Sequence, residues 1–345
     1  MRAHCLFRPL TRIRALTILL AVTVSAAGRP AQVRAQQVPT TLSPAVQSAI
    51  VDSIATALIR TYIFLDTAEE MAELIRTRAA EGAYADCPAP LDFTRQLTAD
   101  LQSISHDLHL RVSVRQPVSQ QAETLPIEER IRRRNEALRR ENYRFEKVEI
   151  LPGNIGYLKF NNFIDAELAG ATAVAAMNFL ANAEAIIIDL RENGGGAPSM
   201  IQLLSSYFFA EPVHLNSFYI RQTDEWEQYW SYAHVPGPRM VDTPLYILTS
   251  ERTFSAAEEF TYNMKNLERA TLVGETTRGG AHPVTGATFA FEGFAIGVSL
   301  PFGRAVNPIT GTNWEGTGIV PHIAVAADDA LDRALEEARR RLRER

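Results

Sequence analysis

The strongest constraint on the fold is a repeated order of strand and helix that begins near residue 148. Residues 185–190 and 244–249 are continuous apolar runs of strand length. Such runs are typical of strands that are buried on both faces of a parallel sheet. Each is followed by a turn and then by a segment with helical spacing of its apolar residues. Because this alternation requires helices packed against a mostly parallel sheet, the sequence predicts an α/β core over residues 148–345.

The remaining elements of this core follow from the same patterns. We expect further strands at 155–160 and 271–274, and helices at 166–181, 199–209, 255–267 and 328–344. A hairpin-like stretch is expected over 288–302, with its turn at Glu292 and Gly293.

The region before residue 116 has a different pattern and predicts three helices. Ser43 and Pro44 combine a hydroxyl N-cap with proline at the first helical position. Asp66 and Glu69 have the spacing of a capping box for a second helix, and the third is expected over 92–104. We therefore expect a three-helix N-terminal domain at 43–115. A charged linker at 116–147 would follow, in which acids alternate with bases, as is typical of a solvated segment.

The first 35 residues have the composition of a secretory signal. They contain six arginines and no acidic residue, followed by an apolar run at 15–26 and small residues suited to cleavage after Ala26 or Ala35. The run is too short to cross about 30 Å of hydrocarbon, so a membrane anchor is not expected after signal removal. Cys5 precedes the run and is therefore not placed for lipid attachment. The sequence predicts signal peptide and tether at 1–35, and a periplasmic or secreted protein.

Charge and cysteine content narrow the function classes. The formal net charge is -5, and loss of the six N-terminal arginines from 35 basic residues leaves 29 against 40 acidic ones. An acidic chain gives no support to a nucleic-acid partner. Cys87 would be the only remaining cysteine, which excludes an intrachain disulfide.

A glycine run follows the apolar strand at 185–190. Residues 189–196 read Asp-Leu-Arg-Glu-Asn-Gly-Gly-Gly. Glycines at the carboxyl end of a strand let the backbone approach a ligand, and their N–H groups can form an oxyanion hole or an anion cradle. The spacing matches neither the dinucleotide fingerprint nor the phosphate P-loop. A flexible turn is the alternative, and the run alone does not decide between them.

Ser255 lies where a strand–turn–helix pattern places the start of a helix. Its hydroxyl would meet the positive end of the helix dipole, and the N–H of Ala256 could serve as a second oxyanion donor. This is a suitable place for a nucleophile. Serine is also a preferred N-cap, and most serines at strand-to-helix junctions have only this structural role, so the position alone favours capping.

A serine nucleophile needs a base and a group that orients it. His109 precedes an alternating apolar pattern that predicts a strand, and Glu315 lies between residues of a glycine-rich turn. His106 and His109 are three residues apart, but no Cys or His cluster accompanies them, so no metal site is expected. A surface loop for Glu315 is the alternative.

These segments together resemble peptidase family S41, which includes C-terminal processing proteases, the tricorn protease core and interphotoreceptor retinoid-binding protein. The resemblance covers about residues 45–335 and is carried in order by DLRENGGG (189–196), TSERTFSAAEEF (249–260), GETTRGGAHP (274–283) and NWEGTGIVPHIAV (313–325). The segments IRTYIFLDTAEEM (59–71) and ISHDLHLRV (104–112) resemble the N-terminal domain of the retinoid-binding-protein-like branch. The family implies an α/β, crotonase/ClpP-like spiral core with an N-terminal helical annex. The interval between 115 and 155 is too short for a PDZ domain, so none is expected.

The resemblance also implies roles for individual residues. Ser255 matches the nucleophile, and Gly194 or Gly195 with the N–H of Ala256 matches the oxyanion hole. Processing proteases use a lysine base in the segment that here reads 277–280, where this chain has arginine and no lysine. Arginine cannot give up its proton near neutral pH.

The tricorn-like branch instead uses a histidine and a glutamate, which His109 and Glu315 match. The implied catalytic set is therefore Ser255, His109 and Glu315. The chain departs from the family pattern at Leu108, where glycine is usual, and at His322, where aspartate is usual.

The expected function is that of an exported serine-type peptidase acting on peptides or unfolded proteins, without metal or organic cofactor. An alternative is a non-catalytic protein that binds an apolar, retinoid- or lipid-like ligand, with aromatic residues at 218–219 and 226–232 lining a cleft. The presence of serine, histidine and glutamate together favours the enzyme. An acyl-CoA enzyme of the crotonase type is disfavoured by the export signal.

Overall fold

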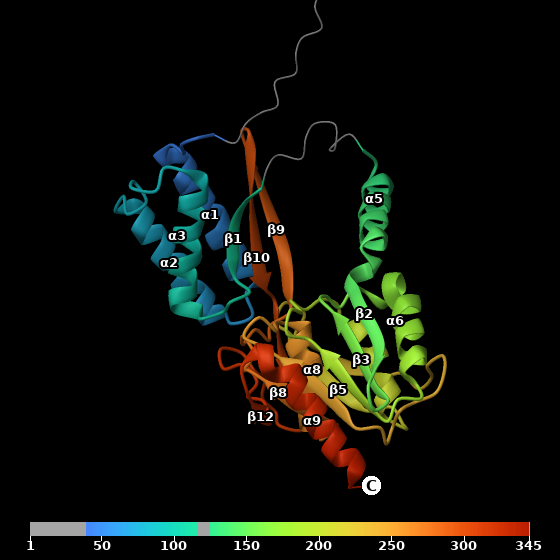
Figure 1. Ribbon diagram of the computed structural model, residues 1–345. Coiled ribbons are helices and arrows are strands. Elements are labelled where there is room, and N and C mark those ends of the chain that lie inside the picture. Colours follow the sequence, from blue (N-terminus) through green and yellow to red (C-terminus); the bar gives the residue numbers. More distant parts are fainter. Residues whose placement is uncertain (1–38, 116–124, 345) are drawn as a thin grey trace, which may run out of the picture. The chain divides into compact units, whose positions relative to one another are not determined.

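A six-stranded sheet forms the centre of the C-terminal region in the computed structural model, which describes residues 39–115 and 125–344 (Figure 1). The strand order is β12-β8-β7-β4-β3-β2. β2 pairs antiparallel with β3, and the other neighbours pair in parallel. The strands are β2 (Phe145–Leu151), β3 (Ile155–Phe160), β4 (Ala185–Asp189), β7 (Leu245–Thr249), β8 (Ala270–Gly274) and β12 (Ile323–Ala324). The expected α/β architecture with a parallel sheet is confirmed.

Both faces of this sheet are covered by helices, as the continuous apolar runs require. In β4, Ile186 and Ile188 pack into one core cluster, whereas Ala185 and Ile187 pack into another. The first cluster includes residues of α6 (Ala166–Leu180), α7 (Pro198–Ser205) and α8 (Ala256–Asn266), and the second includes α9 (Ala330–Arg343). Alternate side chains of a strand point to opposite faces, so β4 is buried at every position.

A second sheet, of order β11-β5-β6, was not expected from the sequence. It is antiparallel and consists of β5 (His214–Ile220), β6 (Glu225–Trp230) and β11 (Gly303–Val306). Phe218 of β5 is buried in the main core, whereas Trp226 and Trp230 of the edge strand β6 are exposed. The aromatic residues that the binding alternative assigned to a cleft are thus divided between the core and an exposed strand.

The N-terminal helices pack on a third sheet whose strands come from both ends of the chain. α1 (Pro44–Thr61), α2 (Leu65–Ala80) and α3 (Pro90–Ser105) share one core cluster with β1 (Arg111–Arg115), β9 (Val284–Phe291) and β10 (Phe294–Pro301). The strand order is β1-β10-β9, and both pairs are antiparallel. The hairpin β9–β10, orange in Figure 1, therefore completes the core of the helical annex.

Local signals at the helix ends were partly right. Ser43 is the N-cap of α1 and accepts from the N–H of Val46 at 3.4 Å. The capping box expected at Asp66 is wrong, because α2 already begins at Leu65 with Phe64 as its N-cap and without a side-chain cap. Asp66 lies in the first turn, where its charge still favours the helix dipole.

The charged segment after β1 contains ordered structure. Residues 116–124 lie outside the described residues, but α5 (Ile127–Arg140) is a helix with no buried residue. The short helix η1 (Asn142–Arg144) leads from it into β2. Within the described chain, no helix is both long and apolar enough to cross a membrane. The expected signal segment at 1–35 lies outside the described residues.

Candidate active site

Ser255 occupies a strained turn between β7 and α8. It is the N-cap of α8, and its backbone angles are φ 58° and ψ -124°. A positive φ is uncommon for a residue with a side chain and marks a strained position that the surrounding structure must hold. A sharp strand-to-helix turn of this kind exposes the nucleophilic serine of α/β-hydrolases. The first N–H groups of α8 have no acceptor within the helix, so they can stabilise negative charge that develops beside the serine.

The glycine run after β4 packs directly against this turn. Gly195 has φ +102°, and a Cβ placed on it would lie 2.6 Å from the Cβ of Ser255 and 2.9 Å from the nitrogen of Ala256. Only glycine fits at this close approach. A Cβ on Gly194 would meet nothing within 4 Å, so this residue borders open space. The structure therefore brings the glycine run, Ser255 and Ala256 together.

The N–H groups of the two candidate oxyanion glycines have acceptors within the protein. The N–H of Gly195 donates to Oδ1 of Asn193 at 3.0 Å, and the N–H of Gly194 donates to the carbonyl of Asn161 at 3.3 Å. Asn193 is fully buried, and its Nδ2 donates to the carbonyl of Phe160 at 2.8 Å. The Asn193 carbonyl in turn accepts from the N–H of Phe254 at 3.1 Å. Asn193 thus fixes the glycine run against the serine turn.

Glu258 fixes the same turn from the helix side. Its fully buried carboxylate accepts from the N–H of Ser255 at 2.9 Å, from the N–H of Gly279 at 2.6 Å and from the N–H of Gly280 at 2.9 Å. The hydroxyl of Thr277 donates to it at 2.5 Å. Burial raises the pKa of Glu258, whereas the four donors lower it. The sequence analysis missed this residue, although the Ser-x-x-Glu spacing of a capping box at 255–258 would have identified it.

His109 lies two residues before β1, and its ring contacts the serine turn at Phe254. Its ring contacts that of Phe254 at an angle of 34°, with centroids 4.4 Å apart, and a Cβ on Gly280 would lie 2.8 Å from its Cε1. The side chain is buried, and neither ring nitrogen has a hydrogen-bond partner in residues 39–115 or 125–344, so the hydroxyl of Ser255 is not hydrogen-bonded to it. Burial lowers the pKa of His109 to about 4, which keeps the imidazole neutral. Catalytic hydrogen bonds are often loose before substrate binds.

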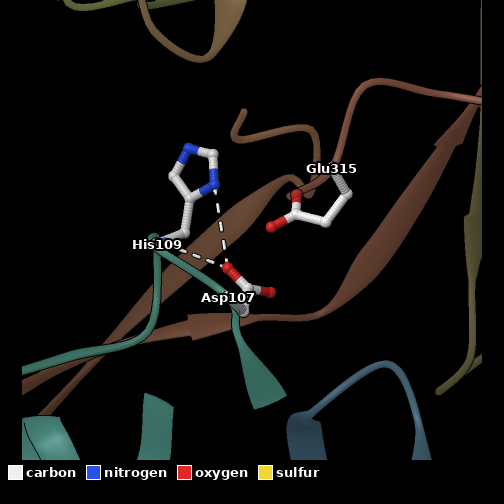
Figure 2. A group of neighbouring side chains, drawn as sticks. All are labelled: Asp107, His109 and Glu315. Carbon is white, nitrogen blue, oxygen red and sulfur yellow. Dashed lines mark hydrogen bonds and ion pairs between the residues drawn. The ribbon is translucent and has the colours of Figure 1, made fainter. Parts of the chain in front are cut away.

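Glu315 approaches His109 together with Asp107. One side-chain atom of each of these three residues lies within 4.8 Å of the others. Figure 2 shows the Glu315 carboxylate pointing toward the space beside the His109 ring and the Asp107 carboxylate. Oε2 of Glu315 accepts from the N–H of Ala281 at 2.5 Å, whereas Oε1 is buried and has no partner in the part of the chain that the structure describes. The structure therefore brings His109 and Glu315 into one cluster without a direct hydrogen bond between them.

His282 and Asp107 complete this cluster and were not singled out from the sequence. Nδ1 of His282 donates to Oδ2 of Asp107 at 2.7 Å and lies 3.6 Å from Oε2 of Glu315. Oδ1 of Asp107 accepts from the backbone N–H of His109 at 2.9 Å, so Asp107 links the two histidines. Their only sequence signal was their place inside segments 104–112 and 274–283, which carry the resemblance described above.

The buried titratable groups of this cluster shift one another's pKa values. Burial raises the pKa of Glu315 to about 7, and the nearby His282 opposes that shift. Burial lowers the pKa of His282, but the hydrogen bond to Asp107 and the charge of Glu315 outweigh it, so the net shift is upward. The arrangement favours a positive charge on His282 beside the two carboxylates.

Two family models match the chain. Residues 154–325 match peptidase family S41, and residues 31–152 match the N-terminal domain of Peptidase_S41 in eukaryotic IRBP.

Solved structures share the fold at low sequence identity. A candidate peptidase from Parabacteroides merdae ATCC 43184 is 17% identical with a TM-score of 0.58, and the alignment covers 86% of this chain and 97% of that one. A lipoprotein from Streptococcus agalactiae is 15% identical with a TM-score of 0.53, covering 88% and 98% of the two chains. The tricorn protease is 14% identical with a TM-score of 0.53, covering 86% of this chain and 37% of its own.

The chain spans only part of some larger relatives. It matches 52% of the length of a candidate S41 protease from Bacteroides fragilis NCTC 9343, with 20% identity, 55% of this chain covered and a TM-score of 0.47. The family models, by contrast, account for nearly all of the chain from residue 31 to residue 325. The chain therefore belongs to peptidase family S41.

Proposed function

We propose that this protein is an exported serine-type peptidase that hydrolyses peptide bonds in peptides or unfolded proteins. Ser255 would be the nucleophile, His109 the general base and Glu315 the carboxylate that stabilises the charged imidazole. The observation that carries the proposal is the strained backbone of Ser255 at the start of α8, with φ 58°. A strain of this kind is retained where it serves function, and here Gly195 packs against Ser255 while the His109 ring contacts Phe254 of the same turn.

The proposed reaction follows the two-step logic of acyl transfer. The Oγ of Ser255 attacks the scissile carbonyl carbon while His109 takes its proton, and the same proton then passes to the leaving amine. Water then attacks the acyl-enzyme. His109 takes a proton from this water and gives it to Oγ of Ser255 as the acid product leaves. A neutral imidazole is ready to accept a proton, and the carboxylates of Asp107 and Glu315 would stabilise the imidazolium that forms.

The oxyanion would be held at the junction of the glycine run and α8. Ala256 is the first residue of α8, where the backbone N–H has no partner inside a helix. Gly194 or Gly195 would provide the second donor by sharing its N–H between the present acceptor and the substrate oxygen. One such donor contributes about 3 kcal/mol of transition-state stabilisation.

The absence of a lysine at 277–280 supports histidine as the base. Arg278 is exposed, and its guanidinium lies 5.5 Å from the centre of the Phe254 ring. Since arginine keeps its proton at neutral pH, it cannot replace the lysine of the processing proteases. Export is supported by the basic and apolar pattern of residues 1–35.

The direct test replaces the proposed nucleophile. Ser255→Ala is expected to lower the cleavage of an unfolded protein substrate at least about 1000-fold and to abolish labelling by a fluorophosphonate probe. Ser103→Ala, on the exposed surface of α3, is the matched control and should leave both unchanged. Cleavage and labelling that persist in Ser255→Ala would exclude this serine as the nucleophile.

A further inference from the structure

Asp107, His109 and Glu315 together have the composition and spacing of a metal-binding group. One ligand atom from each lies within 4.8 Å of the other two, and Nδ1 of His109 is 4.0 Å from Oδ1 of Asp107. Zinc binds imidazole nitrogen and carboxylate oxygen at about 2.0–2.2 Å in tetrahedral geometry, so two donors of one ion lie about 3.4 Å apart. A contraction of at most about 1.4 Å, within reach of side-chain rotation, would therefore let the three atoms share one ion.

Within the described residues, the donor atoms of this cluster have no other partner or retain a free lone pair. His109 is 8% exposed, and neither ring nitrogen has a hydrogen bond to any described residue. Oε1 of Glu315 is likewise buried and without a partner among these residues. Oδ1 of Asp107 accepts from the backbone N–H of His109 at 2.9 Å, which leaves a lone pair available. Buried polar atoms without partners are costly, and a bound cation would satisfy them.

The other oxygen of each carboxylate accepts a hydrogen bond from a residue outside the three proposed ligands. Oε2 of Glu315 accepts from the N–H of Ala281 at 2.5 Å, and Oδ2 of Asp107 accepts from His282 at 2.7 Å. Partners of this kind orient the ligands of known metal sites and sharpen their affinity. The three donors are therefore oriented before any ion arrives.

We propose that Asp107, His109 and Glu315 bind a zinc ion, and that this ion reversibly inhibits the enzyme. Imidazole combined with carboxylate suits Zn²⁺ better than Mg²⁺ or Ca²⁺, which prefer oxygen ligands alone. An ion on Nδ1 of His109 leaves the single proton of the neutral imidazole on Nε2. The ring then has no free lone pair for the proton of Ser255, so bound zinc and proton transfer exclude each other. The inhibitory effect rests on the proposed function, whereas the binding site does not.

Binding is tested in a protein that needs no activity. Ser255→Ala combined with Cys87→Ser removes the proposed nucleophile and the half-buried free thiol. This protein, prepared without a histidine tag and freed of metal, is titrated with Zn²⁺ against a chromophoric chelator. We expect one tightly bound ion per chain. Adding His109→Asn or Glu315→Gln should weaken binding at least about 10-fold. Adding His106→Asn, at an exposed histidine three residues away, should not change it.

A spectroscopic measurement keeps the test independent of variant folding. Co²⁺ bound to the protein with these ligands intact should give the d–d absorption of a low-coordinate site, and Zn²⁺ should displace it stoichiometrically. The site is excluded if no stoichiometric ion binds, if His109→Asn and Glu315→Gln bind as tightly as their parent while folded, or if cobalt shows only the spectrum of the hydrated ion.

The inhibitory consequence has its own readout. In the peptidase with Ser255 intact, activity should fall in proportion to zinc occupancy and return when a chelator is added. Full activity at saturating zinc would overturn inhibition and leave the binding result standing. Failure of the proposed function appears elsewhere, as cleavage that survives Ser255→Ala, and does not affect the binding titration.

Discussion

At the scale of single residues, the site depends on backbone segments that pack so closely that a side chain would not fit between them. Gly195 is the clearest case, because its α-carbon lies against Ser255 and its φ of +102° is unfavourable for any side chain. The residue types were visible in the sequence, since a glycine run after a buried strand indicates close backbone approach. Which glycine touches the serine was not visible, because that contact depends on how two loops meet.

Gly195→Ala is expected to inactivate the enzyme. The added Cβ would lie 2.6 Å from the Cβ of Ser255, so the serine turn must move. We expect at least about a 100-fold loss of kcat/KM together with a lower free energy of unfolding. Gly286→Ala, on β9 with nothing within 4 Å of a new Cβ, is the control. Activity equal to that of the control would show that the contact has no catalytic importance. Peptidase kinetics and denaturant unfolding measure both effects.

His282 is expected to position the proposed catalytic residues His109 and Glu315 through Asp107. Removing its 2.7 Å hydrogen bond in His282→Ala leaves a buried carboxylate without its strongest partner. We expect kcat to fall about 10-fold or more with little change in KM, because no contact with bound peptide is proposed for this residue. His282→Asn restores an N–H donor and should recover part of kcat. His234→Ala, at an exposed histidine, controls for general effects. A change confined to KM, or no recovery in His282→Asn, would contradict the positioning role.

At the scale of elements, the strands of the main sheet were predictable and those of the second sheet were not. β4 and β7 are buried at all five positions, and burial on both faces produces the continuous apolar runs that the sequence shows. β6 lies at a sheet edge with five of its six residues exposed, so it has neither an apolar run nor an alternating pattern. Hydrophobic patterns report burial, and a strand that is not buried leaves no signal in them.

Helix α8 contains a buried acid that should make stability depend on pH. Burial raises the pKa of Glu259 to about 8, and Asn216 opposes the shift. Because the folded-state pKa lies above the ordinary value of 4.5, the folded state binds a proton that the unfolded state releases. The stability linked to this proton is complete below about pH 4.5 and declines as pH rises toward 8.

Glu259→Gln is therefore expected to flatten this decline between pH 5 and pH 8. Its free energy of unfolding should exceed that of the parent most clearly near pH 8, where the glutamate loses its proton. Urea unfolding at several pH values measures the difference. The control is Glu268→Gln, at an exposed position just beyond the same helix. A pH dependence of stability unaffected by Glu259→Gln would show that the acid is charged in the folded protein.

At the scale of the whole molecule, the site is assembled from distant parts of the chain. Asp107 and His282 are 175 positions apart and yet share a 2.7 Å hydrogen bond. The sequence indicated serine, histidine and glutamate through separate motifs and a family resemblance. It could not show that Glu315 has its closest ion pair with His282, or that Asp107 joins both histidines. Such contacts depend on the hairpin β9–β10 crossing to the N-terminal helices, which no local pattern encodes.

The helical annex is not expected to fold alone. Phe294, Ile296 and Val298 of β10 are buried in the same cluster as the helices α1 to α3. A fragment of residues 39–115 lacks them and would expose the apolar face of β1 and the helices. We expect no cooperative thermal unfolding by circular dichroism for this fragment. Residues 39–344 as a single chain should unfold cooperatively. A cooperative transition in the short fragment would show that β9 and β10 are dispensable for its core.

Along the chain, the β9–β10 hairpin lies between His109 and Glu315 of the proposed catalytic set. A polypeptide that stops before residue 284 would hold His109 and Ser255 but lack Glu315 and the two strands that complete the annex core. Such a truncated product is expected to be inactive as a peptidase.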